Sequence, residues 1–171
     1  KSKMMKFRLI NSKTKFLFVL LILFFAFSTQ SWFFSQSNEF LRVIGVKDGD
    51  TVVLLTAAKT EITVRLSEID APERKQAFGT VSRTFLSNLI FGKEVKLEKM
   101  GTDRYGRTLG FIYLRNGTNV NLEMVKNGMA WQYEKYSKSA VLKKAQASAK
   151  SMSIGLWRDP YPVAPWEFRR K

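Results

Sequence analysis

The stretch Val64-Arg-Leu-Ser-Glu-Ile-Asp-Ala-Pro-Glu-Arg74 joins a regular pattern to an irregular acidic segment. It completes an alternation of polar and apolar residues that begins at Glu61 and predicts a half-buried strand over 61–67. Pro72 then ends the regular structure, because proline has no backbone N–H and restricts the residue before it. Arg65 lies between two apolar strand residues, so its side chain points to the opposite face of the sheet from theirs. The stretch predicts a strand that leads charged groups into an irregular acidic segment.

Patterns on both sides of this stretch extend the prediction to five strands and three helices. Strands are expected over 40–46, 51–56, 61–67, 95–100 and 109–114. Helices are expected over 80–91, 119–127 and 139–151. The three prolines of 159–166 predict an extended C-terminal strap. Three strands, a helix, two strands and two helices form an antiparallel meander with helices added, which predicts an α+β fold and a small barrel.

The composition excludes most of the familiar catalytic chemistry. The 171 residues include no Cys and no His. Nucleophile–histidine pairs, His-ligated zinc, disulfides and iron–sulfur clusters are therefore excluded. Any catalysis must use carboxylates, Lys, Arg, Tyr, hydroxyl groups or a hard metal held by oxygen ligands. The apolar share of 45% is enough for the core of a single domain.

The net charge is strongly positive, and it is unevenly distributed. The formal charge is +15, from 29 basic and 14 acidic residues. Residues 1–15 carry six of the basic residues and no acidic one. From Asn38 onward, 23 basic and 14 acidic residues leave a net charge of +9. The body of the protein is therefore basic in its own right, which predicts attraction to a polyanion, either nucleic acid or acidic lipid.

The N-terminal segment resembles a targeting signal. Twelve uninterrupted apolar residues, 16–27, follow the basic stretch, as in a secretory signal. A membrane-spanning helix needs about 20 apolar residues, and 16–34 approaches that length only by including polar ones. A cleaved signal, an uncleaved anchor and a buried core helix all remain open. We expect residues 1–37 to be a signal peptide or membrane anchor, with membrane association through 16–34 if uncleaved, and 38–171 to be an exported domain.

Three clusters of charged residues lie at the ends of predicted strands. They are Asp-Gly-Asp-Thr at 48–51, the stretch at 64–74, and Asp-Arg-Tyr-Gly-Arg at 103–107. Taken singly, they could be a hairpin turn, a helix N-cap with an acidic first turn, and a loop with an internal ion pair. A barrel, however, gathers strand ends around one mouth. We therefore expect the three clusters to meet.

Together these clusters supply the groups needed to hydrolyse a phosphodiester without histidine. Asp50 and Asp70 offer the hard oxygen ligands that Ca²⁺ prefers. Arg65 and Arg107 can each donate two parallel hydrogen bonds to a phosphate. Glu73 can orient or deprotonate the attacking water, and the sequence does not separate these two roles. The prediction depends on these five side chains converging on one pocket.

The order of the three clusters resembles the staphylococcal nuclease (thermonuclease) family. The resemblance continues through Asn-Gly-Met-Ala-Trp at 127–131 to Pro-Trp-Glu-Phe-Arg-Arg at 165–170, and leaves residues 1–37 outside. It implies a five-stranded antiparallel OB-type barrel with three helices. It also implies a calcium-dependent nuclease that cuts single-stranded or denatured DNA and RNA, with little base specificity, to leave 3′-phosphate ends. We expect a monomer.

The resemblance also assigns roles by motif. The calcium ligands correspond to the carboxylates of Asp50 and Asp70 and to the carbonyl of Ala71, where the family's namesake has Thr. The catalytic Arg, Glu and Arg correspond to Arg65, Glu73 and Arg107. Contacts to the terminal phosphate correspond to Arg104, where the namesake has Lys, and to Tyr105. The two tyrosines that pack on the nucleotide correspond to Tyr133 and Tyr136, of which only Tyr136 aligns without adjustment.

Two rival functions use the same basic surface. A non-catalytic nucleic-acid-binding OB module needs basic and aromatic residues but no acidic residues in its groove. Asp50, Asp70 and Glu73 all disfavour binding of a polyanion unless a metal offsets them, so we favour an enzyme. The second rival is a membrane-attached adaptor that only inherits the fold.

Overall fold

The structure is a computed structural model that describes residues 40–170. The predicted signal or anchor over 1–37, with its membrane association through 16–34, lies outside these described residues. Within 40–170, no helix combines the length and the apolar character needed to cross a bilayer.

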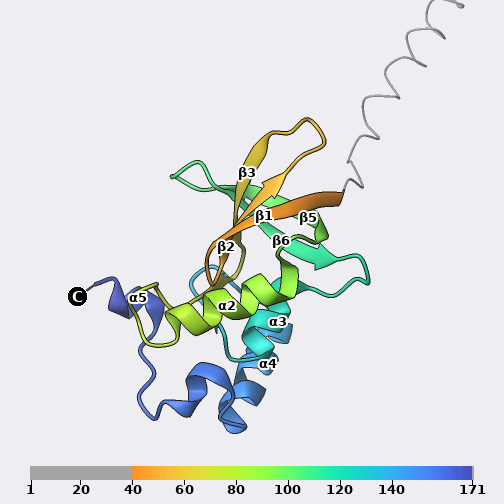
Figure 1. Ribbon diagram of the computed structural model, residues 1–171. Helices are drawn as coiled ribbons and strands as arrows, with labels where there is room; N and C mark the ends of the chain where they lie inside the picture. Colours follow the sequence, from red (N-terminus) through yellow and green to blue (C-terminus); the bar gives the residue numbers. More distant parts are fainter. Residues whose placement is uncertain (1–39, 171) are drawn as a thin grey trace, which may run out of the picture. The chain divides into compact units, whose positions relative to one another are not determined.

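A closed five-stranded barrel forms the centre of the described chain (Figure 1). Its strands are β1 (Phe40–Asp48), β2 (Thr51–Leu55), β3 (Glu61–Leu66), β5 (Glu94–Thr102) and β6 (Thr108–Leu114). They follow one another around the barrel in the order β1-β2-β3-β6-β5. This confirms the predicted α+β barrel.

One strand pair departs from the predicted antiparallel arrangement. β3 and β6 are parallel, with Arg65 opposite Leu109. The other four neighbouring pairs are antiparallel. A ring with an odd number of strands cannot alternate direction all the way around, so closure forces one parallel pair. The prediction of an all-antiparallel barrel is therefore wrong for β3 and β6. This pair, the parallel seam, helps to position the charged clusters.

Three helices cover the barrel and begin close to the predicted positions. They are α2 (Gly79–Ile90), α3 (Val120–Lys126) and α4 (Ala140–Ser151). The side chains of Asn119 and Ser139 cap α3 and α4 by accepting hydrogen bonds from backbone N–H groups of the first turn. Leu86 and Ile90 of α2 are fully buried in the same core as the strand residue Val64. This packing stabilises the barrel end beside which the site lies.

A short second sheet, absent from the prediction, fixes the acidic segment. β4 (Ile69–Asp70) pairs with β7 (Trp131–Gln132), and Asp70 lies opposite Trp131. The buried side chain of Asn121 also donates to the carbonyl oxygens of Ser67 and Gly110 at 2.9 and 3.2 Å. The segment that the sequence marks as irregular is thus held from two sides.

The C-terminal strap is only partly extended. A 3₁₀ turn, η1 (Gly155–Arg158), precedes it, and the one-turn helix α5 (Pro165–Phe168) ends it. Pro165 is compatible with this helix because the first helical residue needs no backbone N–H. Trp166 packs edge-on against Trp131, with ring centroids 5.6 Å apart. The expectation of a strap without helix is therefore wrong at its end, and aromatic packing ties that end to β7.

Candidate active site

Arg65 joins the two predicted calcium carboxylates. Its Nη2 lies 3.0 Å from Asp50 Oδ2 and 2.8 Å from Asp70 Oδ1. Its Nη1 donates to the carbonyl oxygens of Leu66 and Ile69 at 2.8 and 2.9 Å. Only 12% of the Arg65 side chain is exposed. One guanidinium from β3 therefore brings together a turn residue before β2 and the last residue of β4.

Backbone geometry holds Asp50 in place. The Ala71 N–H donates to Asp50 Oδ2 at 2.8 Å, and the Thr51 hydroxyl donates to Oδ1 at 3.1 Å. The turn that carries Asp50 packs tightly against α2, because a Cβ on Gly49 would lie 2.0 Å from the Ser82 Oγ. Glycine in the Asp-Gly-Asp motif is therefore required for this close approach.

Burial disfavours the charged forms of the Asp50 and Asp70 carboxylates when no further cation is present. Burial raises the pKa of Asp50 to about 6, against the lowering effect of Arg65, and the nearby Asp48 carboxylate adds to the rise. Burial likewise raises the pKa of Asp70, although Arg169 and Arg65 both act to lower it. Extra positive charge here would relieve both carboxylates.

The donor set fits a hard divalent cation. A carboxylate offers about four lone-pair positions. Asp50 Oδ1 accepts one hydrogen bond, from Thr51, and Asp70 Oδ2 accepts one, from Arg169, so each of these oxygens keeps a position for a cation. Two carboxylates with the Ala71 carbonyl would need water or substrate oxygens to complete a calcium shell. Residues 40–170 hold no group of three or more acidic side chains arranged for a metal. The site is therefore sparse.

Glu73 is held by a residue that the sequence did not single out. Arg169 Nη1 donates to Glu73 Oε1 at 2.7 Å and to Asp70 Oδ1 at 3.2 Å, and its Nη2 donates to Asp70 Oδ2 at 2.7 Å. Arg169 is 96 residues from Glu73 along the chain, so no local pattern connects them. The only sequence feature that could have pointed to Arg169 was its place in Pro-Trp-Glu-Phe-Arg-Arg at 165–170, where the family resemblance ends.

Arg107 lies in a separate, self-contained loop. Its Nε donates to Asp103 Oδ2 at 2.8 Å, and the backbone N–H groups of Tyr105 and Arg107 donate to Asp103 Oδ1. The guanidinium groups of Arg104 and Arg107 lie 4.8 and 5.5 Å from the centre of the Tyr105 ring. Since Thr108 pairs with Val64 at the parallel seam, the loop ends beside the strand that carries Arg65.

Four of the five side chains predicted to converge thus form one connected cluster. Asp50, Arg65 and Asp70 contact one another, and Arg169 links Glu73 to them. Arg107 reaches the neighbouring strand end, but no ion pair or hydrogen bond between described residues connects it to that cluster.

The two predicted stacking tyrosines differ in how free their rings are. Tyr136 is 64% exposed. Tyr133 stacks on Trp166, with ring centroids 5.2 Å apart and an interplanar angle of 2°, and Tyr136 meets it edge-on. One face of Tyr133 is therefore already covered by a ring. Tyr136 has the Lys135 ammonium 5.4 Å from its ring centre, and its exposure makes it the more accessible stacking surface.

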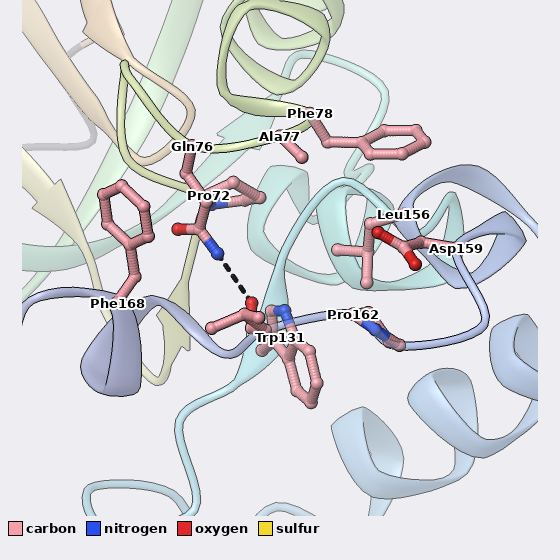
Figure 2. A pocket seen from close by; sticks show the side chains of 10 residues that line it. Pro72, Gln76, Ala77, Phe78, Trp131, Leu156, Asp159, Pro162 and Phe168 are labelled. Carbon is pink, nitrogen blue, oxygen red and sulfur yellow. Dashed lines mark hydrogen bonds between the residues drawn. The ribbon is translucent and has the colours of Figure 1, made fainter. Parts of the chain in front are cut away.

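A cavity of about 230 Å³ lies beside the cluster (Figure 2). Its wall includes Pro72 and Phe168, which directly precede Glu73 and Arg169, and the ring of Trp131. The dashed line in Figure 2 is the 2.6 Å hydrogen bond from the Gln76 amide to the Val163 carbonyl. The strap and the segment after Asp70 are thus joined at two places, at this bond and at Arg169.

Comparison with known proteins agrees with this geometry. A family model described as "Staphylococcal nuclease homologue" matches residues 63–159. The chain is 47% identical to an "Uncharacterized endonuclease" of Haemophilus influenzae, over 80% of this chain and 76% of that protein. It is 42% identical to a "Micrococcal nuclease" of Shigella flexneri, over 75% and 79% of the two chains. This chain therefore belongs to the staphylococcal nuclease family.

Proposed function

We propose that this chain is a calcium-dependent nuclease that hydrolyses DNA and RNA with little base specificity and leaves 3′-phosphate ends. The observation that carries the proposal is the connected cluster of Asp50, Arg65, Asp70 and Glu73 at one end of a small basic barrel. Membership of the family and relatives named endonuclease and micrococcal nuclease support it.

The acidic side of the cluster would hold the cation. Asp50, Asp70 and the Ala71 carbonyl would be the ligands, in keeping with the open position on each carboxylate. Bound Ca²⁺ supplies charge stabilisation to a phosphate oxygen. Because two carboxylates make a sparse site, we expect weak affinity, in the range of about 10⁻⁴–10⁻³ M that is typical of extracellular modules.

Glu73 would place the attacking water. Its side chain is 40% exposed, and Arg169 engages only Oε1. Oε2 is therefore free to accept a hydrogen bond from water, either to orient it or to take its proton.

The two arginines would bind the phosphate unequally. Arg107 uses only Nε in its bond to Asp103, so both terminal nitrogens can donate in parallel to the equatorial oxygens, which become more negative in the transition state. Arg65 has both terminal nitrogens engaged. It can offer Nε, or exchange one of these bonds once another positive charge reaches its carboxylates.

The remaining predicted contacts lie around the loop and the tyrosines. Arg104 and Tyr105 would bind a terminal phosphate, and Tyr136, with Tyr133, would stack on a base. Such stacking tolerates any base, so we expect single-stranded or denatured DNA and RNA to be preferred. We also propose that the protein is exported and acts as a monomer.

An assay on heat-denatured DNA and on RNA, with Ca²⁺ or with excess chelator, tests the function. We expect cleavage with 3′-phosphate ends only when Ca²⁺ is present. Glu73→Gln should abolish most of the cleavage while the protein still binds the nucleic acid. Binding without cleavage by the wild type would instead support a non-catalytic module, and full activity in chelator would contradict the cation site.

A further inference from the structure

We propose that Arg169 is a positioning residue of the active site, which holds the Glu73 carboxylate beside Asp70. The inference rests on the proposed function for the role of Glu73. It goes beyond that function by making the C-terminal strap a part of the site.

Glu73 depends on Arg169 for its position. The bond from Arg169 Nη1 at 2.7 Å is the only hydrogen bond or ion pair of the Glu73 carboxylate within residues 40–170. The same Nη1 donates to Asp70 Oδ1 at 3.2 Å, so the two carboxylates share one nitrogen. Without that positive charge, the two carboxylates would repel each other, and the half-exposed Glu73 side chain would spread over solvent-facing rotamers.

The geometry requires the fork of an arginine. Nη2 pairs with Asp70 Oδ2 while Nη1 bridges Asp70 and Glu73. A planar guanidinium can make these bonds together, whereas the ammonium group of lysine is a single point charge on a flexible stem. Lysine at this position would restore the charge but only part of the orientation.

The strap that carries Arg169 is anchored at several points. Ala164 and Pro165 are buried, and Trp166 stacks on Tyr133. Gln76, three residues after Glu73, donates a hydrogen bond from its amide to the Val163 carbonyl at 2.6 Å. Arg169 directly follows α5, so these contacts set where its side chain starts (Figure 1).

The contacts favour positioning over blockage of the site. Arg169 leaves Glu73 Oε2 unengaged and one lone-pair position open on Asp70 Oδ2. The groups that would contact water and a cation therefore remain available while Arg169 is bound. A blocking arginine would be expected to occupy them.

The kinetic test compares Arg169→Ala with Arg170→Ala on denatured DNA at saturating Ca²⁺. Arg170 is the adjacent arginine, and its side chain has no ion pair or hydrogen bond within residues 40–170, so its variant removes the same charge from the same strap. We expect Arg169→Ala to lower kcat by about 10- to 100-fold with KM changed less than about threefold. Arg169→Lys should recover part of kcat, and Arg170→Ala should stay within about twofold of the wild type.

A double-variant cycle asks whether Arg169 acts through Glu73. In the Glu73→Gln background, Arg169→Ala should lower the residual rate by less than about threefold. Additive losses, or an Arg169→Ala variant as active as the wild type or more so, would overturn the proposal. If Arg169→Ala fails to fold, Arg169→Gln, which keeps the packing of the stem, decides by the same criteria.

A crystallographic comparison in chelator tests the position of Glu73 without any activity measurement. We expect one ordered Glu73 carboxylate in the wild type and several rotamers in Arg169→Ala. A carboxylate that stays in place without Arg169 would contradict the proposal. If the wild-type protein shows an ordered Arg169–Glu73 ion pair but cuts no nucleic acid, the proposed function is contradicted and the positioning of Glu73 by Arg169 is not.

Discussion

The two arginines that the sequence predicts as equal partners occupy opposite environments. Arg65 is 12% exposed and engages both terminal nitrogens with two carboxylates and two backbone carbonyls. Arg107 is 32% exposed and engages only Nε, with Asp103 of its own loop. Arg65 therefore belongs to the folded framework, whereas Arg107 keeps its terminal nitrogens free for a ligand.

This difference follows from where the chain places the two side chains. Arg65 lies within β3, between the turn that holds Asp50 and the short strand that holds Asp70. Arg107 ends a loop whose turn has a left-handed glycine, Gly106, with φ 78°. A strand interior imposes its partners, while a loop that satisfies its own charges leaves its tip available. Substitution of Arg65 should therefore lower stability as well as activity, whereas substitution of Arg107 should lower activity alone.

Arg65→Ala should give the largest effect, because Arg65 supports both the stability of the fold and the activity of the site. It would leave Asp50 without its ion-pair partner and Asp70 with Arg169 alone. We expect the free energy of unfolding to fall by about 3 kcal/mol at pH 7, together with loss of activity. Urea denaturation measures the first effect.

A pH series serves as the control for this variant. At pH 5 the two carboxyl groups can take up protons in place of the lost guanidinium, so the destabilisation should shrink. An Arg65→Ala protein as stable as the wild type at pH 7 would contradict the framework role.

Arg107→Ala should affect catalysis alone. Removal of one preorganised donor to the phosphate lowers the rate by about 10²–10³-fold. The loop would lose one half-exposed ion pair, so the free energy of unfolding should change by less than about 1 kcal/mol. Single-turnover rates, compared with urea denaturation of the same samples, check both parts. Near-normal turnover would remove Arg107 from the site.

Much of this arrangement could be predicted from the sequence, because it depends on local patterns. Alternation predicted the strand over 61–67, and Gly92 and Gly128 predicted where two of the helices end. Strand ends meet at a barrel mouth, so the three charged clusters could be expected together. The parallel pairing of β3 with β6 was missed, although an odd number of strands requires one such pair.

What escaped prediction depends on contacts between distant residues. Nothing near Arg169 marks it as a partner of Glu73, since the strap reaches the site only after the helices have packed. The two hydrogen bonds of Arg65 Nη1 likewise depend on the carbonyl groups of Leu66 and Ile69, which come into place only when β3 turns into β4. Sequence patterns identified the charged residues but not which charges each one already satisfies.

The pH dependence of stability probes the buried side without any substrate. In the cation-free protein, the pKa of Asp50 is about 6 instead of 3.8, so the folded state holds a proton that the unfolded state has released between these values. The stabilisation from this group is complete below about pH 3.8 and is lost as pH rises through 6. That amounts to about 3 kcal/mol.

Urea denaturation of the wild type and of Asp50→Asn in chelator, from pH 4 to 7, isolates this contribution. The wild type should lose more stability across that range than the variant. Added Ca²⁺ should restore stability to the wild type at pH 7 and much less to Asp50→Asn. Equal pH slopes in the two proteins would contradict the buried environment of Asp50.

Tyr136→Ala should give the smallest effect, and it extends the contrast to the aromatic residues. Tyr136 resembles Arg107 in being the more exposed of two similar residues, with 64% of its surface exposed, while Tyr133 is stacked on Trp166 as Arg65 is held among carboxylates. Loss of the stacking contact between one aromatic ring and one base weakens binding by about 1–3 kcal/mol. KM should therefore rise at least about fivefold, with kcat unchanged. Tyr161→Ala, which removes a ring that is 85% exposed and forms no aromatic or cation–π contact with another residue of 40–170, is the matched control. Because stacking involves no phosphate, the slope of affinity against salt should stay the same in Tyr136→Ala, whereas Arg104→Ala should reduce it by about one. A Tyr133→Ala variant that loses substrate affinity while Tyr136→Ala keeps it would reverse the assignment, and would place the base under the strap instead of on the open ring.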